Sequence, residues 1–348
     1  MKMPLWLQLF RGGLFMKKVN VAILGATGAV GREMIKILEE RNFPVNNLKL
    51  LASSRSVGKK IPFKGEDLTI ELAEDSAFEG MDIVLGAAEN DIAKKFAPAI
   101  KKAGAVFVDN SSAFRLCDDV PLVVPEINGA DALKNNGIIA NPNCSTIITL
   151  MAISGINRLS KITKMVASTY QAVSGAGIGG FYELENQIKS IMNGEEPEVS
   201  VFSHQIAYNL IPQIGGESDT EGYTTEEMKL QNESRKILHL PDLLVSCTCV
   251  RVPVMRSHSI SVTLQTEDKL DISDVKKAIS EAEGCRLVDN LSDNEYPMPL
   301  DTSDQNLVFV GRIRKDLTTD NGITLWCCGD QVRKGAAENA IQIAELLV

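Results

Sequence analysis

The chain of 348 residues is 44% apolar, which is enough to bury a large core, and its length favours two domains over one. Its formal net charge is -9, with acidic and basic residues interleaved, so neither a nucleic-acid groove nor an anionic membrane surface is expected as a partner. The seven cysteines contain no CxxC pair and indicate neither a disulfide framework nor a metal site, which favours a reducing cytoplasm.

Residues 1–15 are predicted to be a disordered extension. Arg11 and the glycine pair at 12–13 interrupt their apolar segment, and no small-residue cleavage site follows, which argues against a signal peptide. No apolar run approaches the roughly 20 residues that a membrane-spanning helix needs. We therefore expect the folded chain to begin near Met16.

The first third of the chain alternates β-rich runs with helical periods. The β-rich runs are 19–24, 48–53, 81–87 and 105–111, and the helical periods are 30–41 and 91–103. This rhythm predicts a Rossmann-like α/β domain, in which a parallel sheet carries helices on both faces.

The stretch "VNVAILGATGAVGREMIKIL" combines a strand, a GxxGxxG turn and a helix that begins at once. Glycine lets the backbone approach a pyrophosphate, which the N–H groups and the dipole of a helix N-terminus then bind. A compact βα turn without a ligand is the alternative, but the flanking strand and helix favour a dinucleotide. The predicted cofactor-binding residues of this turn are Gly25, Thr27, Gly28, Ala29 and Val30.

The second strand ends in "ASSRSVGK", where an NAD-binding domain would usually carry an acidic residue for the ribose diol. Ser53, Arg55 and Ser56 offer two hydroxyls and a guanidinium instead, which suit a 2′-phosphate. The segment therefore favours NADP over NAD, with a solvated polar loop as the alternative.

The stretch "NPNCST" places a cysteine between a proline turn and the apolar helical run 146–159. Pro142 and Asn143 force an extended or turn entry, so Cys144 should lie in the first turn of the helix. Free backbone N–H groups at that position would stabilise a thiolate and lower its pKa. Taken alone, such a cysteine is more often a small buried hydrophobic residue, unless a base accompanies it.

The second half changes its pattern near residue 163, where longer alternating runs predict a mostly antiparallel sheet. Helical stretches are expected at 181–193, 225–238 and 272–283, and a last helix closes the chain.

The stretch "TTEEMK" carries two local helix signals. Thr224 and Glu227 match a capping box, and Glu226 with Lys229 forms an i,i+3 pair. On spacing alone, that pair would be a solvated salt bridge.

Only three histidines are available as a base for the thiol. His204 and His239 have apolar or loop surroundings. His258 is the best candidate, because it begins a strand and follows Arg251 and Arg256.

Several motifs, taken together, resemble those of the bacterial aspartate-semialdehyde dehydrogenase family. They are "GATGAVG", "DNSSAFR", "NPNCST", "STYQAVSGAG", "TTEEMK", "CVRVPVMRSHS", "FVGRIRKD" and "KGAA", in that order, and they run from Val19 to the C-terminal helix. The resemblance implies a Rossmann-like NADP-binding domain over 16–142, completed by a C-terminal helix at 330–348. It also implies a mixed α+β catalytic and dimerisation domain over 143–329, similar to that of glyceraldehyde-3-phosphate dehydrogenase.

The same resemblance implies an activity. Members of the family reduce L-aspartyl 4-phosphate to L-aspartate 4-semialdehyde with NADPH, on the route to lysine, threonine, methionine and diaminopimelate. The implied small-molecule partners are the substrate and inorganic phosphate, and the implied assembly is a homodimer.

The roles of individual residues follow from the matched motifs. Cys144 matches the nucleophile that forms an acyl-thioester. His258 matches the acid/base residue, with a pKa expected near neutrality. Gln171 matches the residue that orients the acyl group.

The substrate carries a phosphate, a carboxylate and an ammonium group, and the resemblance supplies partners for each. Arg115, Lys229 and Asn143 match the phosphate ligands, Arg251 the carboxylate clamp, and Glu226 the partner of the ammonium group. Ser174 and Gly175 are expected near the nicotinamide, and Gln331 is expected among the cofactor-binding residues.

Two positions depart from the family pattern. Glu89, in "GAAEND", stands where a Ser/Gly-rich stretch is usual, and its carboxylate could repel a cofactor phosphate. Gln331 stands where Asn is frequent, which keeps an amide. Two alternatives stay open: another acyl-phosphate or acyl-thioester reductase of this fold, and a non-catalytic NADP-binding homologue.

Overall fold

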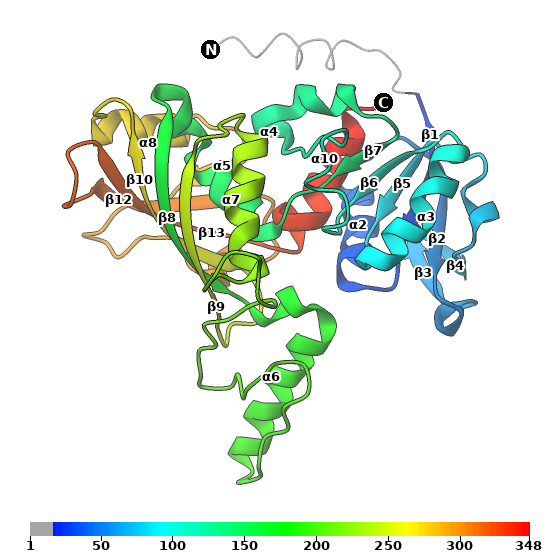
Figure 1. The fold of residues 1–348 in the computed structure, drawn as a ribbon. Helices are drawn as coiled ribbons and strands as arrows, with labels where there is room; N and C mark the ends of the chain where they lie inside the picture. Colours follow the sequence, from blue (N-terminus) through cyan, green and yellow to red (C-terminus); the bar gives the residue numbers. More distant parts are fainter. Residues whose placement is uncertain (1–16) are drawn as a thin grey trace.

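The computed structural model describes residues 17–348, so the extension expected over 1–15 lies outside the described residues. Figure 1 shows two β-sheets with the C-terminal helix α10 (Glu338–Glu345) between them. The expected fold class, a Rossmann-like domain joined to a mixed α+β domain, is confirmed. Within residues 17–348, no helix is long and apolar enough to cross a membrane.

The first sheet has the strand order β3-β4-β2-β1-β5-β6-β7 and is parallel except for the hairpin of β3 and β4. Its strands are β1 (Val19–Leu24), β2 (Val45–Ala52), β3 (Lys60–Phe63), β4 (Glu66–Leu72), β5 (Ile83–Gly86), β6 (Val106–Asp109) and β7 (Ile138–Ala140). The four predicted strands are all present. The sequence does not predict β3, β4 and β7, because β3 and β4 are largely exposed and polar and β7 has only three residues.

Strand β1 explains why this sheet needs helices on both faces. Val21 and Ile23 belong to one buried cluster, and Ala22 and Leu24 belong to the other. The cluster of Leu24 is completed by α3 (Asn90–Lys102), and the cluster of Ile23 by α2 (Ala29–Glu40) and α10. A strand buried on both faces is apolar throughout, as "VNVAIL" nearly is.

The second sheet has the order β11-β12-β13-β10-β8-β9. Its strands are β8 (Ile162–Gln171), β9 (Leu244–Arg251), β10 (His258–Thr266), β11 (Cys285–Leu287), β12 (Val308–Lys315) and β13 (Gly322–Gly329). The inner pairs are antiparallel, as predicted, whereas the edge pairs β8–β9 and β11–β12 are parallel.

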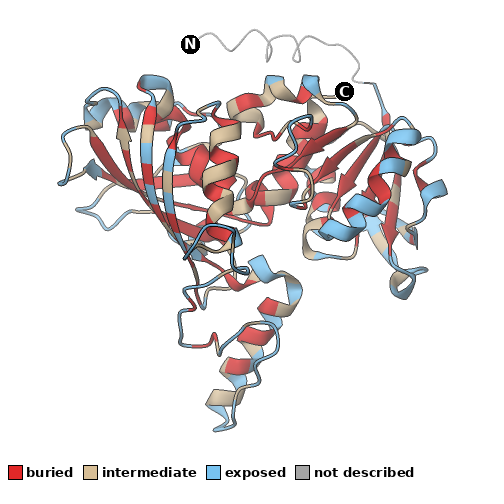
Figure 2. Ribbon diagram, in the orientation of Figure 1, coloured by how far each residue is buried: buried red, intermediate tan, exposed pale blue. Residues whose placement is uncertain are grey.

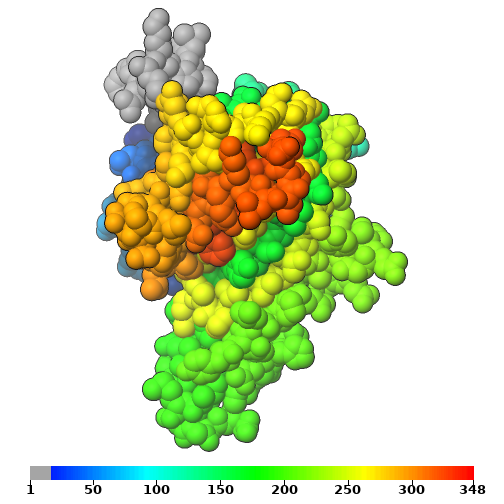
Figure 3. Space-filling model, turned by 90° about the vertical axis from the view of Figure 1, so that its left-hand side faces the viewer, coloured from blue at the N-terminus to red at the C-terminus, as the bar shows by residue number. Residues whose placement is uncertain are grey.

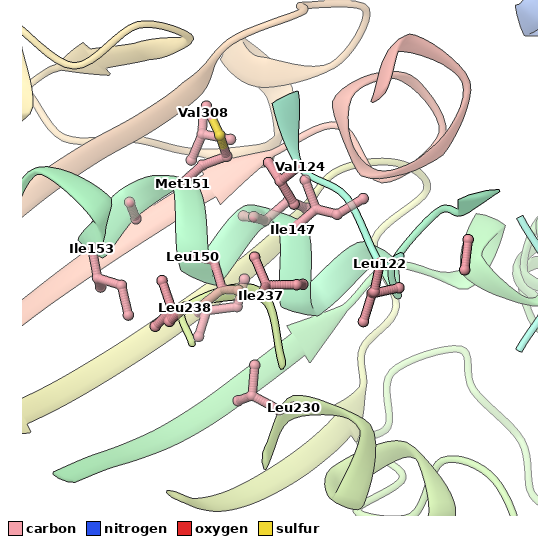
Figure 4. Close-up of a cluster of buried hydrophobic side chains, with 14 of the residues drawn as sticks. Leu122, Val124, Ile147, Leu150, Met151, Ile153, Leu230, Ile237, Leu238 and Val308 are labelled. Carbon is pink, nitrogen blue, oxygen red and sulfur yellow. The ribbon is translucent and has the colours of Figure 1, made fainter. Parts of the chain in front are cut away.

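Helix α5 (Cys144–Leu159) is the centre of the core of this second sheet. Figure 4 shows Ile147, Leu150 and Met151 of α5 packed with Leu230, Ile237 and Val308 from other elements. Because α5 is buried almost all round, its first residue is held rigidly in place. The other helices are α4 (Pro125–Asn128), α6 (Gly177–Met192), α7 (Thr225–Ile237), α8 (Ile272–Ser280) and α9 (Pro299–Thr302).

Among residues 17–348, no helix covers the opposite face of the second sheet. The side chains of β8 alternate between buried residues and the exposed Val166 and Tyr170, and Leu244 on β9 is exposed as well. Figure 2 shows this alternation along the strands. Figure 3 views the molecule from the side of this sheet, with the segment that contains α6, in green, forming the lower projection.

The end of the chain differs from the single helix that the sequence predicts over 334–348. A π-helical turn, Arg333–Ala337, precedes α10. This turn contacts both α2 and α5, so it joins the two halves of the molecule. Arg333 also bonds to Glu33 of α2 at 2.7 Å. The domain bounds 16–142 and 143–329 stay predictions.

Candidate active site

A cavity of about 680 Å³ connects the glycine turn with Cys144. It lies between the two sheets, and residues from both halves of the chain line it. Those from the predicted site are Gly28, Ala29, Val30, Arg115, Asn143, Cys144, Ser174, Gly175, Lys229 and Gln331. One cavity therefore contains the candidate cofactor turn and the candidate nucleophile.

Asn143 is the residue that places Cys144 at the helix N-terminus. Its Oδ1 accepts hydrogen bonds from the N–H groups of Ser145 and Thr146, at 3.0 and 3.3 Å, which caps α5. Its own N–H donates to Glu233 at 2.7 Å. Cys144 is thus the first residue of α5, as the "PNC" turn predicts.

The pKa of Cys144 differs from the sequence-based expectation. Burial and, next, the Glu226 carboxylate raise the pKa of the thiol to about 11, although Arg115, Lys229 and Arg251 act in the opposite direction. The expected lowering at a helix N-terminus is therefore wrong for the free protein, because the thiol is desolvated.

Glu226 holds three candidate site residues together. Its Oε1 accepts from Asn143 Nδ2 at 3.0 Å and from Gln171 Nε2 at 3.2 Å, and its Oε2 accepts from Lys229 Nζ at 2.8 Å. Burial opposes its ionisation, but the Lys229 charge and these hydrogen bonds hold its pKa at about 2. The Glu226–Lys229 pair exists, but the carboxylate is buried, so it is not a solvated surface pair. The predicted capping box of Thr224 and Glu227 is confirmed.

His258 is fully buried at the start of β10. Its Nδ1 accepts a hydrogen bond from the N–H of Ala172 at 3.1 Å, and the carbonyl of Ala172 accepts from Arg251 Nη1 at 2.7 Å. Burial and then the Arg251 charge lower the pKa of His258 to about 3. The pKa near neutrality that the sequence suggests is therefore wrong, because the ring is desolvated beside a cation.

Arg115 lines the cavity, and its guanidinium already donates hydrogen bonds to neighbouring groups. Its Nη1 donates to Glu233 at 3.0 Å, and its Nε and Nη2 donate to the carbonyls of Asn141 and Asn110 at 2.9 and 2.8 Å. Sequence reasoning missed Glu233, which orients both Arg115 and the peptide of Asn143. The sequence feature that could have identified Glu233 is its position seven residues after Glu226, which puts both carboxylates on one face of α7.

The glycine turn has the geometry that a dinucleotide needs. Gly25 has φ +90°, and a Cβ there would lie 2.5 Å from the carbonyl oxygen of Ala87. A Cβ on Gly31 would lie 2.4 Å from the carbonyl of Gly25. Gly28 is the N-cap of α2 without a side-chain cap, which leaves the first N–H groups of the helix to a ligand. Thr27 is in the same turn, and its carbonyl accepts from Arg32. These residues fit a pyrophosphate.

The polar segment after β2 lies beyond the cavity lining. Ser53 and Arg55 are exposed and Ser56 is half-buried, next to a short 3-10 turn at Ser54–Ser56. Within residues 17–348, no carboxylate pairs with Arg55. Its guanidinium is therefore available to an anion.

Ser174 and Gln331 are tied to the loop before His258. Gln331 Nε2 donates to Ser174 Oγ, and Gln331 Oε1 accepts from the N–H of Ser257 at 2.8 Å. Gly175 is next to them and lines the cavity. Glu89, exposed at the N-cap of α3, lines the same cavity.

The fold and the site define a class of protein: a two-domain oxidoreductase in which a dinucleotide turn and a cysteine open into one cavity. Two family models match, the semialdehyde dehydrogenase NAD binding domain over residues 20–136 and the semialdehyde dehydrogenase dimerisation domain over 154–334. The aspartate-semialdehyde dehydrogenase of Synechocystis sp. is 49% identical over 330 residues, with 95% of this chain and 97% of that protein covered. The chain belongs to the aspartate-semialdehyde dehydrogenase family and is an enzyme.

Solved structures agree with this assignment. The chain resembles aspartate semialdehyde dehydrogenase II of Vibrio cholerae complexed with ASA, with a TM-score of 0.93, 43% identity and coverage of 95% of this chain and 98% of that one. It also resembles the Candida albicans enzyme with NADP, with a TM-score of 0.74, 25% identity and coverage of 95% and 98%. The chain therefore shares the complete two-domain fold of these enzymes.

Proposed function

We propose that the protein reduces L-aspartyl 4-phosphate to L-aspartate 4-semialdehyde, with NADPH as reductant and Cys144 as nucleophile, in the biosynthesis of lysine, threonine, methionine and diaminopimelate. One observation carries the proposal: the cavity that begins at the helix α2 N-terminus ends at Cys144, among side chains of both charges. The ASA bound in the related Vibrio cholerae structure supports the choice of substrate.

The charges around Cys144 match those of the substrate. Arg251 presents a planar guanidinium that can bind the α-carboxylate in bidentate fashion, and the ionised Glu226 suits the α-ammonium group. Lys229 and Arg115 would bind the phosphate, together with the amide of Asn143. Gln171, held by Glu226, is within the same group and would orient the acyl chain.

The proposed reaction has two steps on the protein. In the first, the sulfur of Cys144 forms a bond to the acyl carbon, the bond from that carbon to the phosphate oxygen breaks, and a thioester results. NADPH, when bound, supplies the hydride that reduces the thioester. The resulting thiohemiacetal collapses to the aldehyde and releases the sulfur of Cys144.

The cofactor choice rests on the segment after β2. Arg55 has no carboxylate partner within residues 17–348 and is flanked by Ser53 and Ser56, which suits the 2′-phosphate of NADP. Gly28 and its neighbours would hold the pyrophosphate, and Ser174, Gly175 and Gln331, which line the same cavity, would lie near the nicotinamide. The related Candida albicans structure with NADP supports the same choice.

The bare face of the second sheet supports a homodimer. Val166, Tyr170 and Leu244 are apolar side chains exposed on this face, and the matched dimerisation domain covers all three. A second copy of the chain would bury them.

All seven cysteines are free, as a reducing cytoplasm would keep them.

The reverse assay tests the proposed function. Purified protein with NADP, aspartate semialdehyde and inorganic phosphate should form NADPH, and omission of either the aldehyde or phosphate should abolish sustained turnover. Succinic semialdehyde lacks only the amino group and should be a poor substrate, because Glu226 would be left without its partner. Equal turnover of the two aldehydes would instead favour a general acyl-phosphate reductase.

A further inference from the structure

Helix α7 carries four charged residues in a line along one face. Their spacings of three, four and three residues keep them in line on a helix: Glu226, Lys229, Glu233 and Lys236. Glu226 and Lys229 belong to the candidate substrate site and pair with each other at 2.8 Å. Lys236 ends the line, and it has no place in the reaction proposed above.

Lys236 holds the loop 110–121, which follows β6. Its Nζ donates to the main-chain carbonyls of Arg115, Cys117 and Val120, at 2.9, 2.7 and 2.8 Å. An ammonium group has three N–H donors and no acceptor, so these three carbonyls use its full hydrogen-bonding capacity. The loop contains no helix or strand of its own. Lys236 therefore ties an irregular loop to α7 at three points.

Helix α7 holds Arg115 by both its main chain and its side chain. Lys236 bonds to the carbonyl of Arg115, and Glu233, three residues earlier on the helix, accepts from its Nη1 at 3.0 Å. Arg115 and Lys229 both line the cavity with Cys144, and both charges act on the thiol. Because Lys229 is on α7 as well, one helix sets the position of both cations.

The contacts of Lys236 also connect the two halves of the chain. Arg115 lies in the part that the NAD binding domain model matches, whereas α7 lies in the part that the dimerisation domain model matches. The chain connection alone would leave Arg115 with the cofactor half. The ammonium group of Lys236 instead fastens the main chain of Arg115 to the half that contains Lys229.

We propose that Lys236 is a positioning residue for phosphate, which holds loop 110–121 so that Arg115 stays at the cavity with Lys229. This inference rests on the proposed function, in which Arg115 and Lys229 bind the phosphate group. The two cations repel each other while the phosphate is absent, so a loose loop would let Arg115 move away. A fixed loop keeps both cations in place and avoids the cost of ordering them when phosphate binds.

Hydrogen–deuterium exchange of the free protein tests the anchor without any substrate. Lys236→Met keeps an apolar stem but removes the three donors. The amides of Cys117 and Val120, which are bonded within the loop, should then exchange at least about tenfold faster than in wild type. Arg235→Met is the matched control, because Arg235 is the neighbouring cation on α7 and donates to Leu243 instead. Unchanged exchange of the loop in folded Lys236→Met would overturn the proposal.

The reverse assay tests the role in phosphate binding. Lys236→Met should raise the KM for phosphate by about five- to tenfold, while kcat and the KM for aspartate semialdehyde change by less than about twofold. The effect should run through Arg115, so in an Arg115→Ala background Lys236→Met should raise the KM for phosphate by less than about twofold further. Arg235→Met should keep the wild-type KM. Lys236→Gln retains two N–H donors and should fall between wild type and Lys236→Met, and it carries the test if Lys236→Met does not fold.

The kinetic results distinguish failure of this inference from failure of the proposed function. A wild-type KM for phosphate in both Lys236 variants, or an undiminished effect of Lys236→Met in the Arg115→Ala background, would overturn the positioning role and leave the proposed function intact. Wild-type turnover without any need for phosphate would overturn the proposed function and, with it, this inference.

Discussion

The two ends of the cavity are built from different parts of the chain. At the proposed cofactor end, the main chain would do the binding: Gly25 and Gly28 shape a turn, and the first N–H groups of α2 have no side-chain cap. At the substrate end, Asn143 at the start of α5, Gln171 of β8 and Lys229 of α7 all donate hydrogen bonds to the buried carboxylate of Glu226. A main-chain site tolerates exchange of its exposed side chains, whereas a network of buried charges depends on each member.

This comparison predicts that single changes at the substrate end have the larger effects. Cys144→Ser should lower turnover by several orders of magnitude and leave folding and NADP binding nearly intact, because a serine hydroxyl is barely ionised at neutral pH. Steady-state kinetics and fluorescence titration with NADPH measure the two quantities. Cys117→Ser is the matched control, since Cys117 is exposed and should be dispensable. If the Cys144→Ser protein were as active as wild type, Cys144 would not be the nucleophile.

The raised pKa of Cys144 predicts the pH dependence of its alkylation. Only the thiolate reacts, and with a pKa of about 11 the thiolate fraction rises about tenfold per pH unit. In a Cys117→Ser background, the alkylation rate should therefore increase by about 10³-fold between pH 7 and pH 10. A plateau of the rate near pH 7 would show that the thiol is already ionised in the free protein.

Arg251→Lys should damage recognition of the amino acid head. An ammonium group cannot reproduce the planar fork, so kcat/KM for aspartate semialdehyde should fall by about 10²-fold, while the KM for phosphate changes little. Arg286→Lys, a change of an exposed arginine, is the control. Unchanged kinetics in Arg251→Lys would return Arg251 to a structural role beside Ala172.

Lys229→Ala should mainly raise the KM for phosphate in the reverse assay, by about tenfold or more, because one charge-assisted contact is lost. Lys189→Ala is a matched control: Lys189 also pairs with a glutamate on its own helix, Glu185 at 3.0 Å, but neither residue lines the cavity. If both variants keep the wild-type KM, "TTEEMK" is only a helix start.

The smallest effect is expected at the cofactor end. Arg55→Ala should reduce the preference for NADP over NAD by about tenfold, since a charge-assisted hydrogen bond contributes roughly 1.5 to 3 kcal/mol and 1.4 kcal/mol is tenfold. Lys59→Ala, an exposed neighbour, should leave the ratio unchanged. The Glu89 carboxylate would weaken the binding of NADP and NAD alike, so it should not alter this ratio. Equal use of both cofactors by the wild type would make the segment after β2 an ordinary polar loop.

The difference between a main-chain turn and a side-chain network also explains which parts of the site the sequence could predict. The glycine turn and the capped cysteine are local patterns, and the structure has both within a residue or two of the expected positions. The group around Glu226 is not local: Asn143 and Gln171 reach it only through the packing of α5 and β8 against α7. Spacing alone therefore misreads the Glu226–Lys229 pair as a solvated salt bridge.

The pKa values were the least predictable part. The sequence places Cys144 at a helix N-terminus and His258 beside arginines, but it does not give their burial. Burial dominates both residues, raising the pKa of the thiol and lowering that of the imidazole. Glu233 and the peptide of Ala172 escaped notice for a related reason, since neither carries a sequence motif that points to its partners.

The central claim is that Cys144 forms an acyl-thioester, and a rapid-quench experiment without phosphate tests it most directly. Aspartate semialdehyde and NADP should give a burst of about one NADPH per chain, and peptide mapping should find the acyl group on Cys144. The burst should be absent in Cys144→Ser and present in Cys117→Ser. An acyl group on another residue, or sustained NADPH formation with phosphate but no burst without it, would contradict the account.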